Sequence, residues 1–219
     1  MTDAPASITA VTLEGIDLAS LLCSRVCHDV ISPVGAVVNG IELYDTGDAS
    51  MKEFSIDLVR KSSRQASARL QFARIAFGAA GSATAMIDTG DAGSVAQAFF
   101  ADEKTNLIWD VPRALLPKNQ VKLILNLLMI GSSAIPRGGH LTVAGTITGE
   151  QGHFVLTAAG INARIPPHAV DLIAGRAANG VIDAHAIQPY YTGQIAAAAD
   201  MTVSFGLDAD VVTITVAKA

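Results

Sequence analysis

The chain has 219 residues, of which 50% are apolar and 16% are charged, and its formal net charge is −5. This balance is typical of a globular protein and excludes a disordered chain, and the length allows one large domain or two small ones. The acidic charge also argues against nucleic acid as the main partner, because phosphate binding requires a basic excess on the contact face.

The sequence gives no sign of export or of membrane insertion. Residues 1–15 lack a basic start followed by an apolar core, so we expect no signal peptide. The longest strongly apolar stretch, Val121 to Ile130, is interrupted by Lys122 and Asn126 and is too short to span a bilayer. Two cysteines one helical turn apart, at positions 23 and 27, do not form a disulfide framework. We therefore expect a cytoplasmic protein without a membrane partner.

Residues 1–82 form the first predicted domain, built on two long helices. The first helix runs from about Leu13 to Tyr44, and a turn follows at residues 45–50. Ser50 is predicted to cap the second helix, with Glu53 three residues later completing a capping box. The second helix ends at the small residues of 77–84. Because two helices cannot enclose a core, we expect the hairpin to dimerise into a four-helix bundle.

Residues 83–219 form the second predicted domain, in which short strands alternate with helices. Strands are expected at 85–88 and 106–110, and helices at 94–100 and 118–130. Two strand pairs follow, 140–148 with 153–159 and 202–207 with 211–217, and short helices are expected near 167–174 and 191–199. The fold class is thus α+β, with one mostly antiparallel sheet covered by helices.

The first helix has two contrasting faces. Its apolar stripe comprises Leu18, Leu22, Val26, Val30, Val34, Val37, Ile41 and Tyr44. The roughly opposite face comprises Ser20, Ser24, His28, Ser32, Gly35, Asn39 and Glu42. A solvated face would usually carry longer side chains that also favour helix. Small residues around one imidazole leave room for a second protein, although a solvated histidine on a serine-rich surface is the alternative.

His28 has the chemistry of a phosphoryl acceptor. An accessible neutral imidazole is a good nucleophile, and its pKa near physiological pH keeps the unprotonated ring populated. Asp29 follows directly and is expected to hydrogen-bond one ring nitrogen and favour attack by the other; the alternative role is an ordinary ion pair on the helix surface. Pro33 removes a backbone donor and is expected to bend the helix one turn later.

The segment CHDVISP, residues 27–33, resembles the phosphoacceptor motif of histidine kinases. Residues 21–43 and 62–79 are similar to the alphaproteobacterial ChpT-type histidine phosphotransferases, and the resemblance extends over essentially the whole chain. It implies that His28 is the phosphoacceptor, with Asp29 and Pro33 as its motif neighbours. It also implies a dimerising hairpin followed by a degenerate histidine-kinase-ATPase-like (Bergerat) α/β sandwich domain.

The nucleotide motifs of such a kinase domain are degenerate here. The box Asn-Leu-Leu-x-Asn-Ala, which helps to hold the magnesium of ATP, is matched at Asn126, Leu127 and Leu128 but reads Ile130 and Gly131 at its end. Isoleucine cannot ligate magnesium. Residues 157–166 lack the Asp and Gly-x-Gly of the next box, and residues 186–199 lack the Gly-rich lid. We therefore expect no cofactor on this chain and a core role for Asn126.

The second helix adds a basic line to the predicted partner surface. Arg60, Arg64 and Arg74 align with Ser67 and Gln71 at steps of three and four residues, a spacing that also occurs on ordinary solvated faces. Such a line would steer an acidic receiver domain. The residues predicted to contact a partner are Ser24, Arg25, Ser32, Pro33, Gly35, Asn39, Arg60, Arg64 and Arg74.

The predicted function is phosphotransfer within a two-component phosphorelay. The phosphoryl group would pass from a phospho-aspartate on the receiver domain of a hybrid histidine kinase to His28, and then to receiver domains of response regulators, which would supply Mg²⁺. Two alternatives stay open: a divergent autophosphorylating histidine kinase, and a receiver-binding adaptor without catalysis. Cys23, Cys27 and His28 do not share one helix face and lack a fourth ligand, so no metal site is expected.

Overall fold

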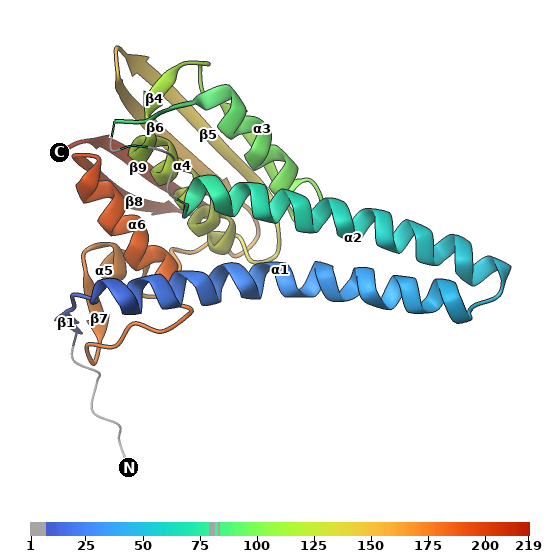
Figure 1. The fold of residues 1–219 in the computed structure, drawn as a ribbon. Coiled ribbons are helices and arrows are strands. Elements are labelled where there is room, and N and C mark those ends of the chain that lie inside the picture. The colour runs from blue at the N-terminus through green and yellow to red at the C-terminus, as the bar shows by residue number, and fades with distance from the viewer. Residues whose placement is uncertain (1–7, 79–81, 83) are drawn as a thin grey trace.

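The computed structural model describes residues 8–78, 82 and 84–219. A short strand β1 (Ile8–Ala10) precedes α1 (Gly15–Thr46) and α2 (Ala49–Ala76). The two long helices run antiparallel and extend as an arm beyond the rest of the molecule (Figure 1). The predicted domain boundary between residues 82 and 83 falls at the edge of the described residues and stays a prediction.

The prediction that Ser50 caps α2 is wrong. The cap is Asp48, whose carboxylate accepts hydrogen bonds from the backbone N–H groups of Ser50 and Met51, each at 3.0 Å. Ser50 lies inside the first turn, and its hydroxyl donates to Asp48 as well. An acidic cap also complements the positive end of the helix dipole, which a serine cannot do.

The second half contains the predicted strands and helices together with shorter strands. It begins with β2 (Met86–Asp88), α3 (Thr89–Phe100), β3 (Thr105–Asp110), β4 (Leu115–Pro117) and the long helix α4 (Lys118–Ala134). The chain continues through β5 (Gly139–Thr148), β6 (Gln151–Ala159), α5 (Ala169–Ile173), β7 (Arg176–Ala178), α6 (Ile187–Ala198), β8 (Met201–Asp208) and β9 (Val211–Lys218).

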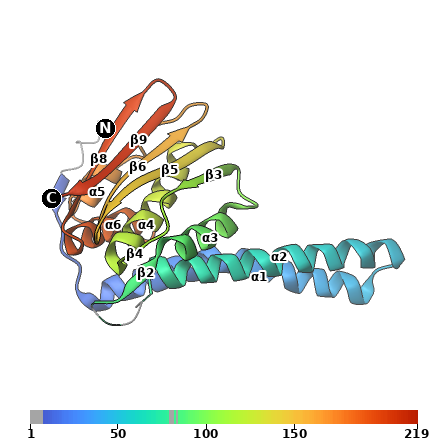
Figure 2. The same ribbon diagram turned by 90° about the horizontal axis from the view of Figure 1, so that it is seen from above.

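The main sheet has the strand order β3-β5-β6-β9-β8. β3 is parallel to β5 and the remaining pairs are antiparallel, in agreement with the predicted mostly antiparallel sheet. Figure 2 shows α3, α4 and α6 between this sheet and the helical hairpin. β1 pairs with β7 and β2 with β4 in two further ladders; three of these four strands were not predicted, because three residues are too few to show an alternating pattern.

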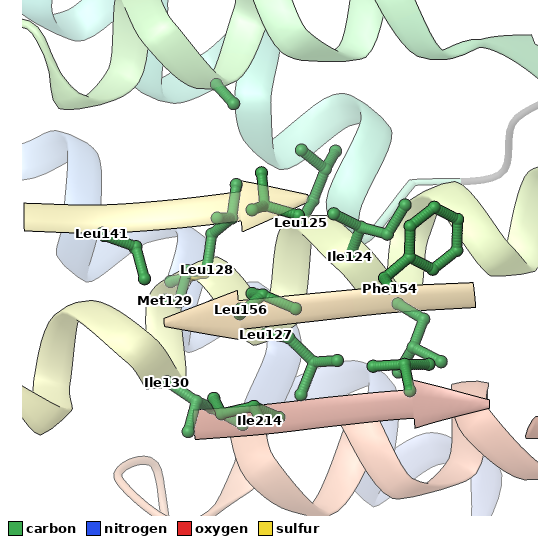
Figure 3. Close-up of a cluster of buried hydrophobic side chains, with 14 of the residues drawn as sticks. Ile124, Leu125, Leu127, Leu128, Met129, Ile130, Leu141, Phe154, Leu156 and Ile214 are labelled. Atoms are coloured by element: carbon green, nitrogen blue, oxygen red, sulfur yellow. The ribbon is translucent and has the colours of Figure 1, made fainter. Parts of the chain in front are cut away.

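Helix α4 forms the centre of the core. Every residue from Gln120 to Gly131 is buried, and Phe154, Leu156 and Ile214 pack on it from the sheet (Figure 3). The apolar stretch from Val121 to Ile130, which is too short to span a bilayer, is thus part of the core helix of the second half. Burial on all sides explains why apolar residues occur around the whole circumference of this helix.

Helix α1 is long and apolar enough, by length and composition alone, to cross a membrane. A helix that presents an apolar face to other helices passes the same test. α1 carries the Arg25–Asp29 ion pair midway, and its first turns pack through Leu18 and Leu22 against a cluster that contains Ile187 of α6. These contacts are those of an amphipathic helix that packs on protein.

The hairpin also packs on the second half through α2. The rings of Phe72 and Phe99 lie 4.3 Å apart between centroids, and Phe72 is buried. The Asn126 side chain donates a hydrogen bond of 3.1 Å to the carbonyl of Ala76 at the end of α2. The two halves therefore share one continuous apolar core, which includes Phe72 and Ala76.

Candidate functional site

His28 projects from the middle of α1 into solvent. Its side chain is 80% exposed, and its Nδ1 lies 3.5 Å from Oδ1 of Asp29. Nδ1 is therefore the nitrogen that faces a neighbouring side chain. A carboxylate next to Nδ1 favours the tautomer that carries the proton there, which leaves the lone pair of Nε2 available.

Asp29 is itself held in place. Arg25, one turn earlier on α1, donates from Nε to Oδ2 of Asp29 at 3.0 Å. Both side chains are partly buried, so the ion pair is less screened than one in open solvent. Because one oxygen is bound to Arg25, the other is directed at the imidazole. Asp29 thus contacts both His28 and Arg25, and its role toward the imidazole stays a prediction.

Small side chains line the face of α1 that carries the imidazole, and the larger exposed side chain of Ile31 borders that face. Ser24, Ser32 and Asn39 are exposed, and a side chain built at Gly35 would meet no other atom within 4 Å. The structure thus places these four predicted residues on an open surface along α1. Their contact with a partner stays a prediction.

Two other predicted partner contacts occupy different positions. Pro33 is buried, contrary to the prediction that it lies on the partner surface. It is seven residues from Gly40, which packs against Val59 of α2, so both lie on the side of α1 that faces α2. Arg25 is engaged with Asp29 and is turned toward the second half, which leaves it little surface to offer a partner.

The basic line on α2 is exposed but lies apart from the histidine. Arg60, Arg64 and Arg74 are exposed, and Arg60 contacts Asp57 at 3.4 Å. Helical geometry places Arg60 and Arg64 away from Ser55 and Val59, which pack against α1. Arg74 instead borders the groove between the two helices, beside Cys23 of α1. Within one chain the structure therefore does not combine these arginines and His28 into one surface.

The predicted apolar stripe of α1 divides between two environments. Leu18 and Leu22 pack on the second half, whereas Val34, Ile41 and Tyr44 are exposed. The stripe also omitted two exposed apolar residues, Ile31 and Val38, at 70% and 50% exposure. These belong with Val34 and Ile41 on one open face, which we call the apolar face of α1.

Sequence reasoning missed Arg69 of α2. Its Nη1 donates a 2.7 Å hydrogen bond to the backbone carbonyl of Asp29, and its Nη2 contacts Oε1 of Glu103 at 2.9 Å. Arg69 thus joins α1, α2 and the loop before β3 next to the candidate nucleophile. The signal in the sequence was Pro33, four residues after Asp29, because a proline leaves such a carbonyl without its helical donor.

A cavity of about 460 Å³ lies where α4, α5, β7 and the start of α6 approach Arg25 of α1. Its walls include Ile130, His168, Asp183 and Gln188. The pKa of Asp183 is lowered, chiefly because its carboxylate accepts the backbone N–H of Ala186. This carboxylate is therefore engaged in capping the segment that leads into α6.

Asn126 does not line this cavity. Its amide donates to the carbonyls of Ala76 and Lys122, while Gln188 donates to its backbone carbonyl at 2.8 Å. The side chain is fully buried, in agreement with the predicted core role. Within the described ranges, 8–78, 82 and 84–219, no three His, Cys, Asp or Glu side chains are grouped to hold a metal ion.

Three comparisons place the chain among known proteins. Residues 89–211 match the family model described as histidine phosphotransferase C-terminal domain. The protein phosphotransferase ChpT of Brucella abortus (strain 2308) is 52% identical over 200 residues, which cover 91% of this chain and 95% of that protein. A solved structure of a bacterial phosphotransferase superimposes with a TM-score of 0.87 at 49% identity, covering 94% of this chain and 98% of the other.

Proposed function

This chain belongs to the histidine phosphotransferase family, and we propose that within its phosphorelay the phosphoryl group is carried on Nε2 of His28. The observation that carries the proposal is the contrast around the imidazole: Nδ1 faces a carboxylate fixed by Arg25, whereas the rest of the ring is exposed on a face of small residues. Such an arrangement prepares one nitrogen for attack and leaves space for a partner to reach it.

We propose a transfer step that requires no proton donor or acceptor other than His28 itself. Nε2 of the neutral ring attacks the phosphorus of an aspartyl phosphate on the donor receiver domain, and the bond between phosphorus and the aspartyl oxygen breaks. The receiver leaves as a carboxylate, and His28 keeps its proton on Nδ1, where Asp29 stabilises the positive charge that develops on the ring. The reverse step passes the group to an aspartate on the next receiver, and Mg²⁺ on the receiver neutralises the phosphoryl oxygens.

The donor is proposed to be the receiver domain of a hybrid histidine kinase, and the acceptors to be receiver domains of response regulators. Ser24, Ser32, Gly35 and Asn39 provide the docking face along α1. The small side chains there allow a helix of the receiver to lie close enough for its aspartate to reach His28. The exposed arginines of α2 steer acidic receivers toward the hairpin.

We propose that the working form is a homodimer, with the apolar face of α1 buried against a second copy. Ile31, Val34, Val38 and Ile41 are 46–70% exposed in the single chain, and Phe54 and Leu70 of α2 are likewise exposed. An apolar groove of about 540 Å³ between Cys23 of α1 and Leu70 of α2 continues this surface. A four-helix bundle across a two-fold axis would cover these residues.

The protein is further proposed to be cytoplasmic and to use no ATP of its own. Two features of the second half support phosphotransfer without a kinase step. Asn126 is bound within the core, and Ile130 lies at the cavity wall where the resembling kinase motif has a second asparagine. Neither residue offers an oxygen to a metal-bound nucleotide.

A reconstituted relay tests this proposal. The protein is incubated with a receiver domain carrying ³²P-phosphoaspartate, and a second receiver is then added. We expect label to appear on this chain, to be labile in acid, and to move on to the second receiver. Direct incubation with γ-³²P-ATP and Mg²⁺ is expected to leave the chain unlabelled, and rapid labelling by ATP would instead support the autophosphorylating kinase.

The matched histidine controls complete the test. His28→Ala is expected to lose label, whereas His153→Ala, which removes an exposed histidine of β6, is expected to keep it. Binding of receivers by the wild type without any label would support the adaptor.

A further inference from the structure

We propose that Arg69 is a positioning residue that holds the phosphoacceptor turn by capping the backbone carbonyl that Pro33 leaves without a helical partner. Its guanidinium also attaches this turn to Glu103 in the second half. This inference rests on the proposal that His28 accepts the phosphoryl group, and it adds the device that keeps the turn of His28 in one conformation.

Pro33 interrupts the hydrogen-bond ladder of α1. In an α-helix the N–H of each residue donates to the carbonyl four residues earlier. The carbonyl of Asp29 would therefore accept from residue 33, but Pro33 has no N–H, and its ring also crowds that carbonyl. A partly buried carbonyl without a donor costs free energy comparable to a lost hydrogen bond. α1 nevertheless runs without interruption from Gly15 to Thr46.

Arg69 supplies the missing donor from the neighbouring helix. Its Nη1 lies 2.7 Å from the Asp29 carbonyl oxygen, which is short for an N–H···O hydrogen bond, as expected of a charged donor. Its Nη2 contacts Oε1 of Glu103 at 2.9 Å, and the side chain is 27% exposed. Because the planar fork presents two nitrogens in a fixed geometry, one guanidinium binds the two groups through separate atoms, whereas a lysine would have to reach both from its single nitrogen.

Two arginines thus hold Asp29 from its two ends. Arg25 binds its carboxylate and Arg69 binds its carbonyl, so neither the backbone nor the side chain of Asp29 can turn independently of the other. Because the second carboxylate oxygen contacts Nδ1 of His28, a displacement of this residue alters both the tautomer and the direction of the imidazole.

The same contact fixes the distance between the phosphoacceptor and the second half. A narrow cleft of about 200 Å³ between the two halves is lined by Arg25, Asp29, Arg69, Phe99 and Glu103. Just beyond Arg69 on α2, Phe72 stacks on Phe99, so a polar contact and an apolar contact act side by side. In a protein that receives its phosphoryl group from a partner, a fixed second half gives each receiver the same surface to meet.

A double-mutant cycle between Pro33 and Arg69 tests the inference. Pro33→Ala restores the N–H that the Asp29 carbonyl lacks, so Arg69 should matter less in that background. We expect Arg69→Ala to slow transfer from a phosphorylated receiver by about tenfold in the wild-type background. In the Pro33→Ala background the same change should slow transfer by less than about threefold. Arg137→Ala, an exposed arginine outside the site, serves as the control and should leave the rate unchanged in both.

The imidazole provides a readout that a merely structural role would not move. Ring ¹⁵N chemical shifts of His28 are expected to show mainly the Nδ1-protonated tautomer in the wild type and in Arg137→Ala. Arg69→Ala should increase the Nε2-protonated form, and Pro33→Ala/Arg69→Ala should recover the wild-type distribution. Urea unfolding identifies variants that do not fold, and Arg69→Lys, which keeps the charge but not the fork, provides a conservative second variant that should also slow transfer.

The outcomes separate this inference from the proposed function. If phosphoramidate and phosphorylated receivers both fail to label His28 in the wild type, the proposed function fails regardless of Arg69. If the wild type is labelled while Arg69→Ala matches it in rate and tautomer, Arg69 does not position the turn. Equal effects of Arg69→Ala in the wild-type and Pro33→Ala backgrounds would overturn the capping of the Asp29 carbonyl.

Discussion

Two polar residues that look similar in the sequence have very different surroundings in the structure. His28 and Asn126 are both polar residues on long helices, yet the imidazole is 80% exposed and the amide is fully buried. The first has a free surface for a second protein, and the second is held by the carbonyls of Ala76 and Lys122. Exposure therefore separates the proposed phosphoacceptor from the residue that supports the fold.

The core amide yields a stability prediction. Asn126→Ala leaves the carbonyl of Ala76 without its donor where α2 meets α4, and it also opens space in a packed core. We expect the free energy of unfolding to fall by about 1–3 kcal/mol, as when a buried hydrogen-bonding group loses its partner. Urea denaturation measures this loss, with Asn106→Ala on the exposed side of β3 as the control. An unchanged unfolding midpoint would show that Asn126 is not part of the interface between the two halves.

The docking face yields a steric prediction. Ser32→Trp places a large ring on the open face next to His28, so a receiver should no longer approach, and receiver-dependent transfer should fall by at least about tenfold. Phosphoramidate needs no docking surface and should still label the imidazole. Transfer from receivers at the full rate in Ser32→Trp would exclude this face as the docking site.

At the level of the helices, the sequence predicted the positions of the helices better than it predicted what each helix face contacts. The period of α1 identified a helix with one polar face, because small residues and His28 recur at helical spacing. It could not divide the apolar side between neighbours, because Leu22 and Val38 look alike in a pattern of hydrophobicity. Only packing shows that the first contacts the second half and the second is exposed.

The exposed apolar face yields a prediction about assembly. Val38→Glu places a charge in the centre of the proposed dimer interface, where it would be desolvated without a partner, so the protein should become monomeric at micromolar concentration. Light scattering is expected to give about twice 22.6 kDa for the wild type and about that mass for the variant. Val170→Glu, the same change at an exposed valine of α5, should stay dimeric. A monomeric wild type would contradict the bundle.

The start of α3 yields a prediction about pH. The pKa of Asp88 is lowered, first by the hydrogen bond from Arg113 and then by the backbone N–H groups of Asp91 and Gly90 that it caps. Its contribution to stability is therefore present above its ordinary pKa and is lost as the pH falls through the lower folded-state value. Asp88→Asn should flatten this part of the acid limb when the unfolding midpoint is measured against pH. An unaltered acid limb in the variant would show that Asp88 does not contribute.

The whole molecule joins two halves with different sequence patterns through one shared core. The loss of nucleotide motifs around Ile130 and in residues 157–166 was visible in the sequence, because it depends on which residue types are present. The contacts of Arg69 were not visible in the sequence. Asp29 and Glu103 lie 40 and 34 positions from Arg69 along the chain, and only the tertiary fold brings them together. Polar contacts between residues far apart in the chain produce no periodic pattern in the sequence.

Locating the phosphoryl group after transfer tests whether His28 carries it. The wild-type protein is labelled by a phosphorylated receiver, digested under neutral conditions that preserve phosphohistidine, and the labelled peptide is identified by mass spectrometry. We expect one phosphorylated residue, His28, in the α1 peptide that contains CHDVISP. Label on another histidine, or on the His28→Ala protein at the wild-type level, would contradict this assignment.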